Sequence, residues 1–320
     1  MSSKDFTFID LFAGIGGMRL GFESAGGKCL LTSDIDTLAL ETYKENFHPR
    51  HAHTYAGDIF KLASKDVPKH DVLLAGFPCQ PYSLAGLRKG LDDPRGTVFL
   101  EIIRILEDKK PQAFLLENVK GLIGHDQGRT FDYIVSMLTG AGYHVDYKVL
   151  NTMTHGGVPQ NRERVFIVGF RDKKALEKFV YPEPITLTKS IADMLEKGTV
   201  APKYYYDSRF KSFAEIKKGV TEEGVVYQWR RKYVRANKSG VCPTITANAG
   251  SGGHNLPLIK IKDGIRKLTP RECANLQAFP KSFKLPSYMS DSTLYHQFGN
   301  SVTVSVISRI AKNMAKVLSE

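Results

Sequence analysis

The first 170 residues alternate short apolar segments with segments of helical periodicity, and this alternation restricts the fold more than any other feature of the chain. Apolar segments of strand length stand at Phe6–Leu11, Cys29–Ser33, Asp71–Gly76, Ala113–Glu117, Tyr143–Leu150 and Val165–Phe170. Helical patterns fill the intervals at about Gly17–Ala25, Thr37–Asn46, Gly96–Asp108 and Thr130–Gly140. Strands that alternate with helices predict an α/β fold, a doubly wound and mostly parallel sheet with helices on both faces.

The alternation stops after residue 170, where the composition of the chain changes. Tyr181-Pro-Glu-Pro184 is typical of a linker. Residues 189–289 are basic, rich in glycine, proline and aromatic residues, and only weakly periodic, whereas residues 301–318 return to a helical pattern. We therefore predict a large domain over 1–188 that is completed by 290–320, with a smaller, irregular domain inserted at 189–289.

The positive charge of the chain is concentrated in one segment. Residues 181–290 hold 19 lysines and arginines against 9 acidic residues, whereas residues 1–180 hold 23 against 22. A separated excess of this size is typical of a surface that binds a polyanion, although a solvated basic face has the same composition. Within Tyr227–Arg235, basic side chains alternate with aromatic ones, which suits contacts to bases and phosphates or a basic strand packed by its aromatics.

Several classes of protein are disfavoured by the composition. No apolar run approaches the roughly 20 residues that a membrane helix needs, and the residues before Phe6 leave no room for a signal peptide, so we expect a cytoplasmic protein without a membrane partner. The cysteines at 29, 79, 242 and 273 lack the spacing of a zinc site. We therefore predict no metal, and a structural role for Cys242 and Cys273.

A glycine-rich turn follows the first predicted strand. In Phe12-Ala-Gly-Ile-Gly-Gly17 the small residues allow close approach of the backbone to a ligand, although a purely structural turn would look the same. Asp34, after the second strand, can accept hydrogen bonds from both hydroxyls of a ribose, and Asp58 can bind an adenine amino group. The G-x-G-G spacing differs from the G-x-G-x-x-G of pyrophosphate sites, which favours a cofactor without phosphates such as S-adenosylmethionine.

Three chemically active residues stand near predicted strand ends. Cys79 follows the strand Asp71–Gly76 and begins a long segment rich in glycine and charge, a placement suited to nucleophilic chemistry, although most free cysteines are structural. Glu117 ends a neighbouring strand, and Arg164 stands just before another. Because the ends of parallel strands converge on one rim of a sheet, we expect Cys79, Glu117 and Arg164 to share a pocket.

Six segments, in their order and spacing, resemble the conserved blocks of DNA (cytosine-5) methyltransferases of bacterial restriction-modification systems. They are Phe12–Gly17, Pro78–Gln80, Glu117–Val119, Gln160–Arg164, Arg266–Pro280 and Gly299–Val302. The resemblance covers residues 6–170 and 264–318. It implies a Rossmann-like, S-adenosylmethionine-dependent catalytic and cofactor-binding domain at 1–188 and 290–320, and a target-recognition domain at 189–289.

The resemblance also implies roles for individual residues. Cys79 corresponds to the thiolate that attacks cytosine C6, Glu117 to the acid at N3 and N4, Arg164 to the residue at O2, and Arg162 to a support for a phosphate and for the pocket. The implied cofactor contacts are Phe12, Gly14, Gly16, Asp34, Ile35, Asp58, Ile59, Pro78, Asn300 and Val302. The implied DNA contacts are Gln80, Ser83, Arg88, Arg230, Arg231, Arg235 and Thr244.

The implied function is transfer of a methyl group from S-adenosylmethionine to C5 of a flipped-out cytosine in a short duplex DNA site, through a covalent adduct of Cys79 with C6. Such an enzyme protects host DNA from a restriction endonuclease without a stable complex, and we expect a monomer. The segment 227–253 resembles a subgroup that acts on GCNGC-type sites. Two departures from the family pattern stand out: Ala278 where glycine is usual, and one extra residue in Thr154–Pro159.

Three other functions are consistent with parts of the sequence. An RNA cytosine methyltransferase shares the catalytic blocks but usually has a shorter and less basic recognition domain. A catalytically inactive DNA-binding regulator would not need Cys79, Glu117 and Arg164 together. A nucleotide-dependent oxidoreductase explains neither Pro78-Cys79-Gln80 nor the basic segment.

Overall fold

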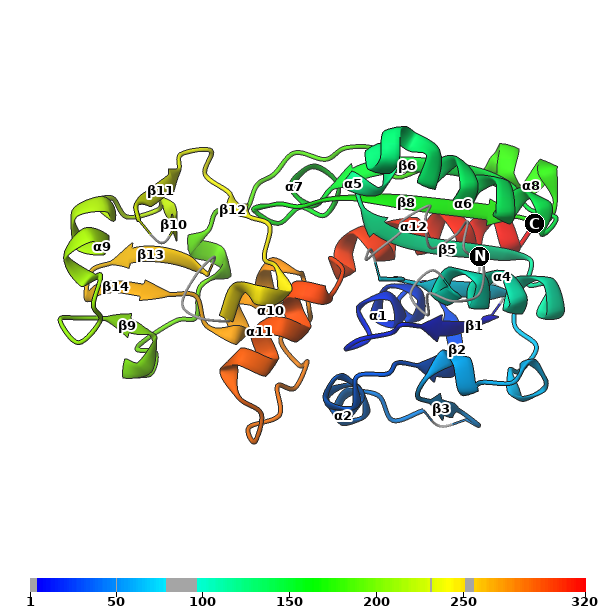
Figure 1. Ribbon diagram of the computed structural model, residues 1–320, viewed down its shortest axis with the longest axis horizontal. Helices are drawn as coiled ribbons and strands as arrows, with labels where there is room; N and C mark the ends of the chain where they lie inside the picture. The colour runs from blue at the N-terminus through cyan, green and yellow to red at the C-terminus, as the bar shows by residue number, and fades with distance from the viewer. Residues whose placement is uncertain (1–4, 50, 79–96, 231, 251–255) are drawn as a thin grey trace.

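The chain folds into a larger and a smaller lobe, with helices between them (Figure 1). The computed structural model describes residues 5–49, 51–78, 97–230, 232–250 and 256–320. Within these ranges, no helix combines the length and apolar character needed to cross a membrane. The larger lobe holds a seven-stranded sheet and the smaller lobe a five-stranded one.

The seven-stranded sheet confirms the doubly wound, mostly parallel arrangement. Its strands are β1 (Phe6–Leu11), β2 (Gly27–Ser33), β3 (Thr54–Ala56), β4 (Val72–Ala75), β5 (Ala113–Val119), β6 (His144–Asn151) and β8 (Glu163–Phe170). They lie in the order β3-β2-β1-β4-β5-β8-β6. The neighbouring pairs are parallel except at β8, which runs antiparallel to both β5 and β6.

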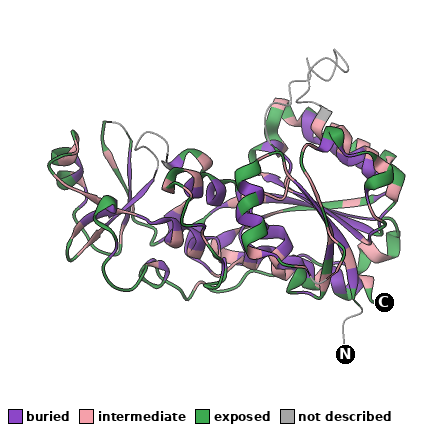
Figure 2. Cartoon of the chain, turned by 90° about the horizontal axis from the view of Figure 1, so that it is seen from below, coloured by how far each residue is buried: buried purple, intermediate pink, exposed green. Residues whose placement is uncertain are grey.

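Helices cover both faces of this sheet. The main ones are α1 (Gly17–Glu23), α2 (Thr37–Asn46), α4 (Thr97–Lys109), α6 (Arg129–Gly140) and α12 (Val304–Leu318), with the short α5 (Gly121–Gly124), α7 (Thr152–His155) and α8 (Lys173–Lys178). Side chains alternate across a strand. Phe8 of β1 therefore packs with Phe22 of α1 and Ile307 of α12, whereas its neighbour Ile9 packs in the same core as Ile102 of α4. The purple strands between the outer helices in Figure 2 are this double core, and α12 packs against the sheet in one half of it.

The smaller lobe has more regular structure than its sequence suggests. Its strands are β9 (Tyr205–Tyr206), β10 (Val226–Trp229), β11 (Val234–Asn237), β13 (Pro257–Ile261) and β14 (Gly264–Lys267), all antiparallel in the order β11-β10-β13-β14-β9. Strands of two to five residues are too short to produce a clear period in the sequence. Helix α9 (Phe213–Gly219) covers one face, where Ile216 packs with Tyr227 and Trp229.

A third core joins the two lobes. Val226 and Ile259, on the other face of the five-stranded sheet, belong to the same buried cluster as Tyr43 of α2. The cluster also includes residues of α10 (Pro270–Leu276) and α11 (Asp291–Asn300), which lie between the lobes in Figure 1. Burial of this apolar surface fixes the orientation of the smaller lobe against the larger one.

The backbone at the end of α10 explains why glycine is usual at position 278, where this chain has alanine. The amide of Phe279 donates to the carbonyl of Ala274 at 3.0 Å, and that of Ala278 donates to the carbonyl of Asn275 at 2.9 Å. These two bonds form a Schellman motif, in which the residue at position 278 must adopt a left-handed backbone conformation that favours glycine. Ala278 has a φ of 56° there.

Two close backbone contacts link the region of the smaller lobe to segments at the rim of the larger sheet. The short strands β7 (Gln160–Asn161) and β12 (Cys242–Pro243) pair in parallel. A Cβ atom on Gly299, near the end of α11, would lie 2.3 Å from the carbonyl carbon of Thr246 and 2.4 Å from the amide nitrogen of Ala247. Only glycine permits this approach, so α11 rests directly on the backbone that follows β12.

Candidate active site

A cavity of about 500 Å³ opens at the rim where β1, β2, β4 and β5 end. Nine of the residues predicted for catalysis or cofactor binding line it: Phe12, Gly14, Asp34, Ile35, Pro78, Glu117, Arg162, Arg164 and Asn300. Segments that are far apart in the sequence therefore converge on one space. Such rims are where ligands bind in doubly wound folds.

One side of the cavity is suited to a nucleoside with a charged tail. The amide of Gly14 donates to Asp34 Oδ2 at 2.6 Å, and the amide of Asp36 donates to Asp34 Oδ1 at 2.8 Å. Each carboxylate oxygen keeps a further lone pair, so Asp34 can still accept two hydroxyls. Gly14 has a φ of 53° with open space where a Cβ would stand, and Phe12 has a φ of 54°. Left-handed backbone at a non-glycine residue such as Phe12 is strain of the kind found at ligand sites.

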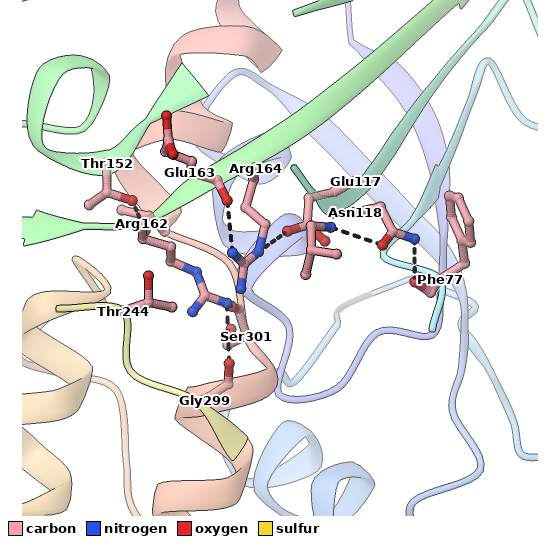
Figure 3. Close-up of polar contacts among 12 residues, drawn as sticks. Phe77, Glu117, Asn118, Thr152, Arg162, Glu163, Arg164, Thr244, Gly299 and Ser301 are labelled. Carbon is pink, nitrogen blue, oxygen red and sulfur yellow. Dashed lines mark hydrogen bonds and ion pairs between the residues drawn. The ribbon is translucent and has the colours of Figure 1, made fainter. Parts of the chain in front are cut away.

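The other side of the cavity holds a buried ion pair. Arg164 Nε lies 2.9 Å from Glu117 Oε1, and 11% of the Glu117 side chain is exposed (Figure 3). Burial raises the pKa of Glu117 above its ordinary value, against the opposing positive charges of Arg164 and Arg162. A carboxyl group whose pKa is raised by burial shares a proton with a ligand more readily than an exposed one.

Arg164 reaches this position by a different route from the one predicted. The prediction relied on parallel strands that end at a common rim, but β8 is antiparallel and Arg164 lies near its beginning. Val119 at the end of β5 pairs with Arg164, so the beginning of β8 and the end of β5 meet at the same edge. Glu117 is on the same face as Val119, which brings its carboxylate to the guanidinium.

Asn118 is a site residue whose role the sequence did not reveal. Its Nδ2 donates to the carbonyl of Phe77 at 3.0 Å, and its Oδ1 accepts from the amide of Val119 at 2.9 Å. The side chain thereby holds the segment Phe77–Pro78, which lines the cavity immediately before the predicted nucleophile. Cys79 itself lies outside the described residues, as do Gln80, Ser83 and Arg88.

Arg162 is almost completely buried, with 2% of its surface exposed. Its Nη1 donates to the carbonyl of Ile245 at 2.8 Å, and its Nη2 donates to the carbonyls of Gly299 (3.1 Å) and Ser301 (Figure 3). Burial lowers the pKa of this guanidinium, and the nearby charge of Arg164 adds to the effect. Two roles were predicted for Arg162, support of a phosphate and support of the pocket. The geometry favours support of the pocket, because N–H groups that donate to backbone carbonyls are not directed at a phosphate.

Four residues predicted to contact the cofactor do not line this cavity. A Cβ on Gly16 would lie 2.3 Å from the ring of Phe47, so Gly16 is required for packing at the start of α1. Val302 and Ile59 are buried in the two cores that flank the sheet. Asp58 accepts from the amide of Phe60 at 3.0 Å and begins a single 3₁₀ turn. Their contacts with a cofactor stay predictions.

A second cavity, of about 490 Å³, lies beside β10, β11 and β12 of the smaller lobe. It brings together three of the predicted DNA contacts, Arg230, Arg235 and Thr244, with Gln228 and Asn237. Arg231, the fourth residue predicted in this region, lies outside the described residues. The sequence did not single out Asn237, because an asparagine in a short basic segment gives no signal of its own.

Comparison with known proteins identifies the family. A family profile described as C-5 cytosine-specific DNA methylase matches residues 6–316. The chain belongs to this family. It is 48% identical over 310 residues to Type II methyltransferase M.Bsp6I of Bacillus sp. (strain RFL6), an alignment that covers 96% of this chain and 97% of that protein. It is 40% identical to Type II methyltransferase M.HpaII of Haemophilus parainfluenzae, with 98% of this chain and 90% of that protein covered.

The fold agrees with solved structures of the family. The crystal structure of S. pombe Dnmt2 methyltransferase matches with a TM-score of 0.77 and 21% identity, and the match covers 98% of this chain and all of that one. The structure of Entamoeba histolytica methyltransferase EhMeth matches with a TM-score of 0.72 and 19% identity. This cytosine-5 DNA methyltransferase is therefore an enzyme of the Type II restriction-modification class that uses S-adenosylmethionine and acts on DNA. The oxidoreductase and the inactive regulator are set aside.

Proposed function

We propose that this methyltransferase acts on a flipped-out cytosine in a short duplex site, through a covalent adduct between Cys79 and cytosine C6. The observation that carries the proposal is the buried Glu117–Arg164 pair in the same cavity as Gly14 and Asp34. A proton donor for the base and an acceptor for a ribose thus face one space. The segment Phe77–Pro78 on the cavity wall leads directly to Cys79 in the chain.

The adduct solves a chemical problem, because C5 of cytosine is a weak nucleophile within an aromatic ring. The Cys79 thiolate forms a bond to C6, N3 takes a proton from Glu117, and C5 becomes the nucleophilic carbon of an enamine. Bound S-adenosylmethionine would supply an electrophilic methyl group to C5 and leave as the thioether S-adenosylhomocysteine. Loss of the C5 proton to a base then restores the C5–C6 double bond as the C6–sulfur bond breaks and returns the thiolate, and N3 returns its proton to Glu117.

The chain's own residues prepare this reaction. Burial raises the pKa of Glu117, which favours the sharing of a proton between its carboxyl group and N3. Arg164 holds the Glu117 carboxyl in place and also donates to the carbonyl of Glu163 at 2.8 Å, and we assign its free edge to O2 of the base. Asp34 and Gly14, with Phe12, Ile35, Pro78 and Asn300, hold the cofactor.

Flipping and recognition belong to the same proposal. The faces of a stacked base are covered, so the target must leave the duplex before a thiolate reaches C6. We assign recognition to residues 189–289, whose excess of eleven positive charges suits a phosphate backbone. In the cell we expect a monomer in the cytoplasm that protects DNA from a restriction endonuclease without binding it stably.

Trapping of the adduct tests the mechanism. On a duplex that contains 5-fluorocytosine, the full-length enzyme with S-adenosylmethionine should form a lasting covalent complex, because fluorine does not leave as a proton does. Cys79→Ala should form no complex and show no turnover while it still binds cofactor and DNA. Cys29→Ala, at a buried cysteine that lines neither of the two cavities, is the matched control and should keep both properties.

The outcomes separate the alternatives. Turnover by Cys79→Ala would exclude the adduct. Faster methylation of RNA than of duplex DNA would assign the chain to RNA instead.

A further inference from the structure

The second cavity is lined by one face of a β-hairpin. In β10 and β11, Gln228 pairs directly with Arg235, and Val226 pairs with Asn237. Residues two apart on a strand share a face, so Gln228, Arg235 and Asn237 all project to the same side. The opposite face carries Tyr227 and Trp229 into the core beneath α9. One face of β10 and β11 therefore packs beneath α9, while the other carries Val226 in the core between the lobes and Gln228, Arg235 and Asn237 along the cavity.

The orientations of the amide groups on this polar face are determined by their anchors. Gln228 Oε1 accepts from Arg230 Nη2 at 3.1 Å, and a guanidinium only donates, so the Gln228 amino group is directed elsewhere. Asn237 Nδ2 donates to the carbonyl of Val226 at 3.0 Å, and a carbonyl only accepts, so Asn237 presents its oxygen. Neither amide can be reversed without loss of its anchor.

The face therefore presents donors at one end and an acceptor at the other. Gln228 offers its amino group, and the exposed Arg235 offers its guanidinium, which has no hydrogen bond to any described residue. Asn237 offers a carbonyl oxygen. In the major groove, a G·C pair presents two acceptors, guanine N7 and O6, followed by the donor N4 of cytosine. An A·T pair presents an acceptor, a donor and an acceptor. Against the donor, donor and acceptor of the hairpin, its second position would place donor against donor and its third would place acceptor against acceptor.

We propose that this hairpin reads a G·C pair in the major groove, with Gln228 and Arg235 on guanine and Asn237 on the N4 amino group of the paired cytosine. The inference rests on the proposed action on duplex DNA. It adds the identity and orientation of one base pair, because the reversed C·G pair presents its groups in the opposite order.

The geometry places this pair within the same site as the target cytosine. Asn161 also lines the second cavity, while the next residue, Arg162, lines the first. Asn151 Oδ1 accepts from the amide of Met153 at 3.1 Å, so the Asn151 amino group donates to Asn161 Oδ1 at 2.7 Å. Asn161 therefore presents its own amino group as a further donor at the border between the two cavities. Thr244 Oγ1 donates to the carbonyl of Asn161 at 2.7 Å and holds this border in place.

The test begins with the methylated sequence itself. Sequencing of DNA from cells that express the full-length enzyme should show every methylated cytosine in one short motif that contains a further invariant G·C pair. In duplexes of that motif, 7-deazaguanine at the invariant guanine removes only N7. We expect it to lower kcat/KM roughly five- to hundredfold. Inosine at the same position, which keeps N7 and O6 and loses only the minor-groove amino group, should leave kcat/KM unchanged.

Variants assign the contact to the hairpin. Gln228→Ala or Arg235→Ala should weaken methylation of the motif, and the variant whose side chain contacts N7 should be insensitive to 7-deazaguanine. Arg235 is exposed, so Arg235→Ala tests the inference even if the loss of the buried Gln228 prevents folding. Gln112→Ala, at an exposed glutamine that precedes β5 and lies at the opposite end of this strand from Glu117, is the matched control and should keep the full 7-deazaguanine effect.

The outcomes separate this inference from the proposed function. A motif without an invariant G·C pair beyond the target overturns the inference, as does a 7-deazaguanine effect that is absent from the wild type or undiminished in both variants. Absence of any methylated cytosine in DNA overturns the proposed function instead.

Discussion

Replacement of Gly299 by alanine should force the two lobes apart at the point where α11 meets the backbone of residues 246–247. The added Cβ would lie 2.3 Å from the carbonyl carbon of Thr246 and 2.4 Å from the amide nitrogen of Ala247. Unbonded carbon atoms approach to about 3.5–4.0 Å, so the two segments must separate by roughly 1 Å. Both neighbours are backbone atoms and cannot rotate aside. Such overpacking lowers the free energy of unfolding by about 1–3 kcal/mol.

The same displacement should reduce catalysis. Arg162 holds the carbonyls of Ile245 and Gly299 on one guanidinium, so separation of these segments weakens at least one of the two bonds. Asn300 lines the first cavity and is the last residue of α11, so it would move with this helix. A misplacement of about 1 Å can lower a rate by up to a hundredfold. We therefore expect a reduced kcat together with a higher KM for S-adenosylmethionine.

Urea unfolding and steady-state methyl transfer are the two assays, with Gly140→Ala as the control. Gly140 ends α6, and a Cβ there would meet no atom within 4 Å. Alanine should be neutral at that position or stabilise the helix by up to about 1 kcal/mol. If Gly299→Ala matched the wild type in unfolding midpoint and in both kinetic constants, the close approach of α11 to residues 246–247 would be refuted.

Three further predictions concern single side chains. Ala278→Gly should raise the free energy of unfolding, measured by urea denaturation, by about 0.5–1 kcal/mol, because relief of the left-handed φ of 56° outweighs the greater conformational entropy that glycine loses on folding. A destabilised variant would contradict the Schellman motif. Asp34→Ala should weaken S-adenosylmethionine binding about ten- to hundredfold by calorimetry, and an unchanged affinity would remove Asp34 from the ribose site. Burial raises the pKa of Asp10 to about 8, so the folded state retains a proton that the unfolded state loses near pH 4. Stability should therefore fall as pH rises from about 4 to 8, by at most about 1.4 kcal/mol per unit, and Asp10→Asn should flatten this slope in urea titrations at several pH values.

The sequence predicted those parts of the molecule that depend on local patterns. Apolar segments such as Ala113–Leu116 form buried parts of strands, and their composition and flanking residues reveal them without tertiary information. The cavity residues Glu117 and Asp34 follow from their places at the ends of such strands. The five short strands of the smaller lobe depend on pairing between distant segments, so no local period marks them.

Individual side-chain roles were less predictable, because they depend on contacts across the chain. Arg162 and Arg164 are two residues apart in one basic motif, yet one binds backbone carbonyls of the α11–α12 junction and the other binds Glu117. Gly14 and Gly16 belong to one glycine-rich turn, yet only Gly14 faces the cavity, whereas Gly16 accommodates Phe47. In both pairs, the distinction comes from what approaches each residue in space.

The alternation of side chains around β7 has a consequence for attempts to exchange specificity between relatives. Gln160 accepts a hydrogen bond from the amide of Ile245 and donates one to the carbonyl of Leu276. Asn161 lines the second cavity, whereas Arg162 lines the first. A transplant of residues 189–289 would move the hairpin but leave Asn161 behind in the recipient. If recognition lies in residues 189–289 as proposed, such a chimera would keep the recipient's side chain at position 161, and a complete change of specificity would also need an exchange at that position.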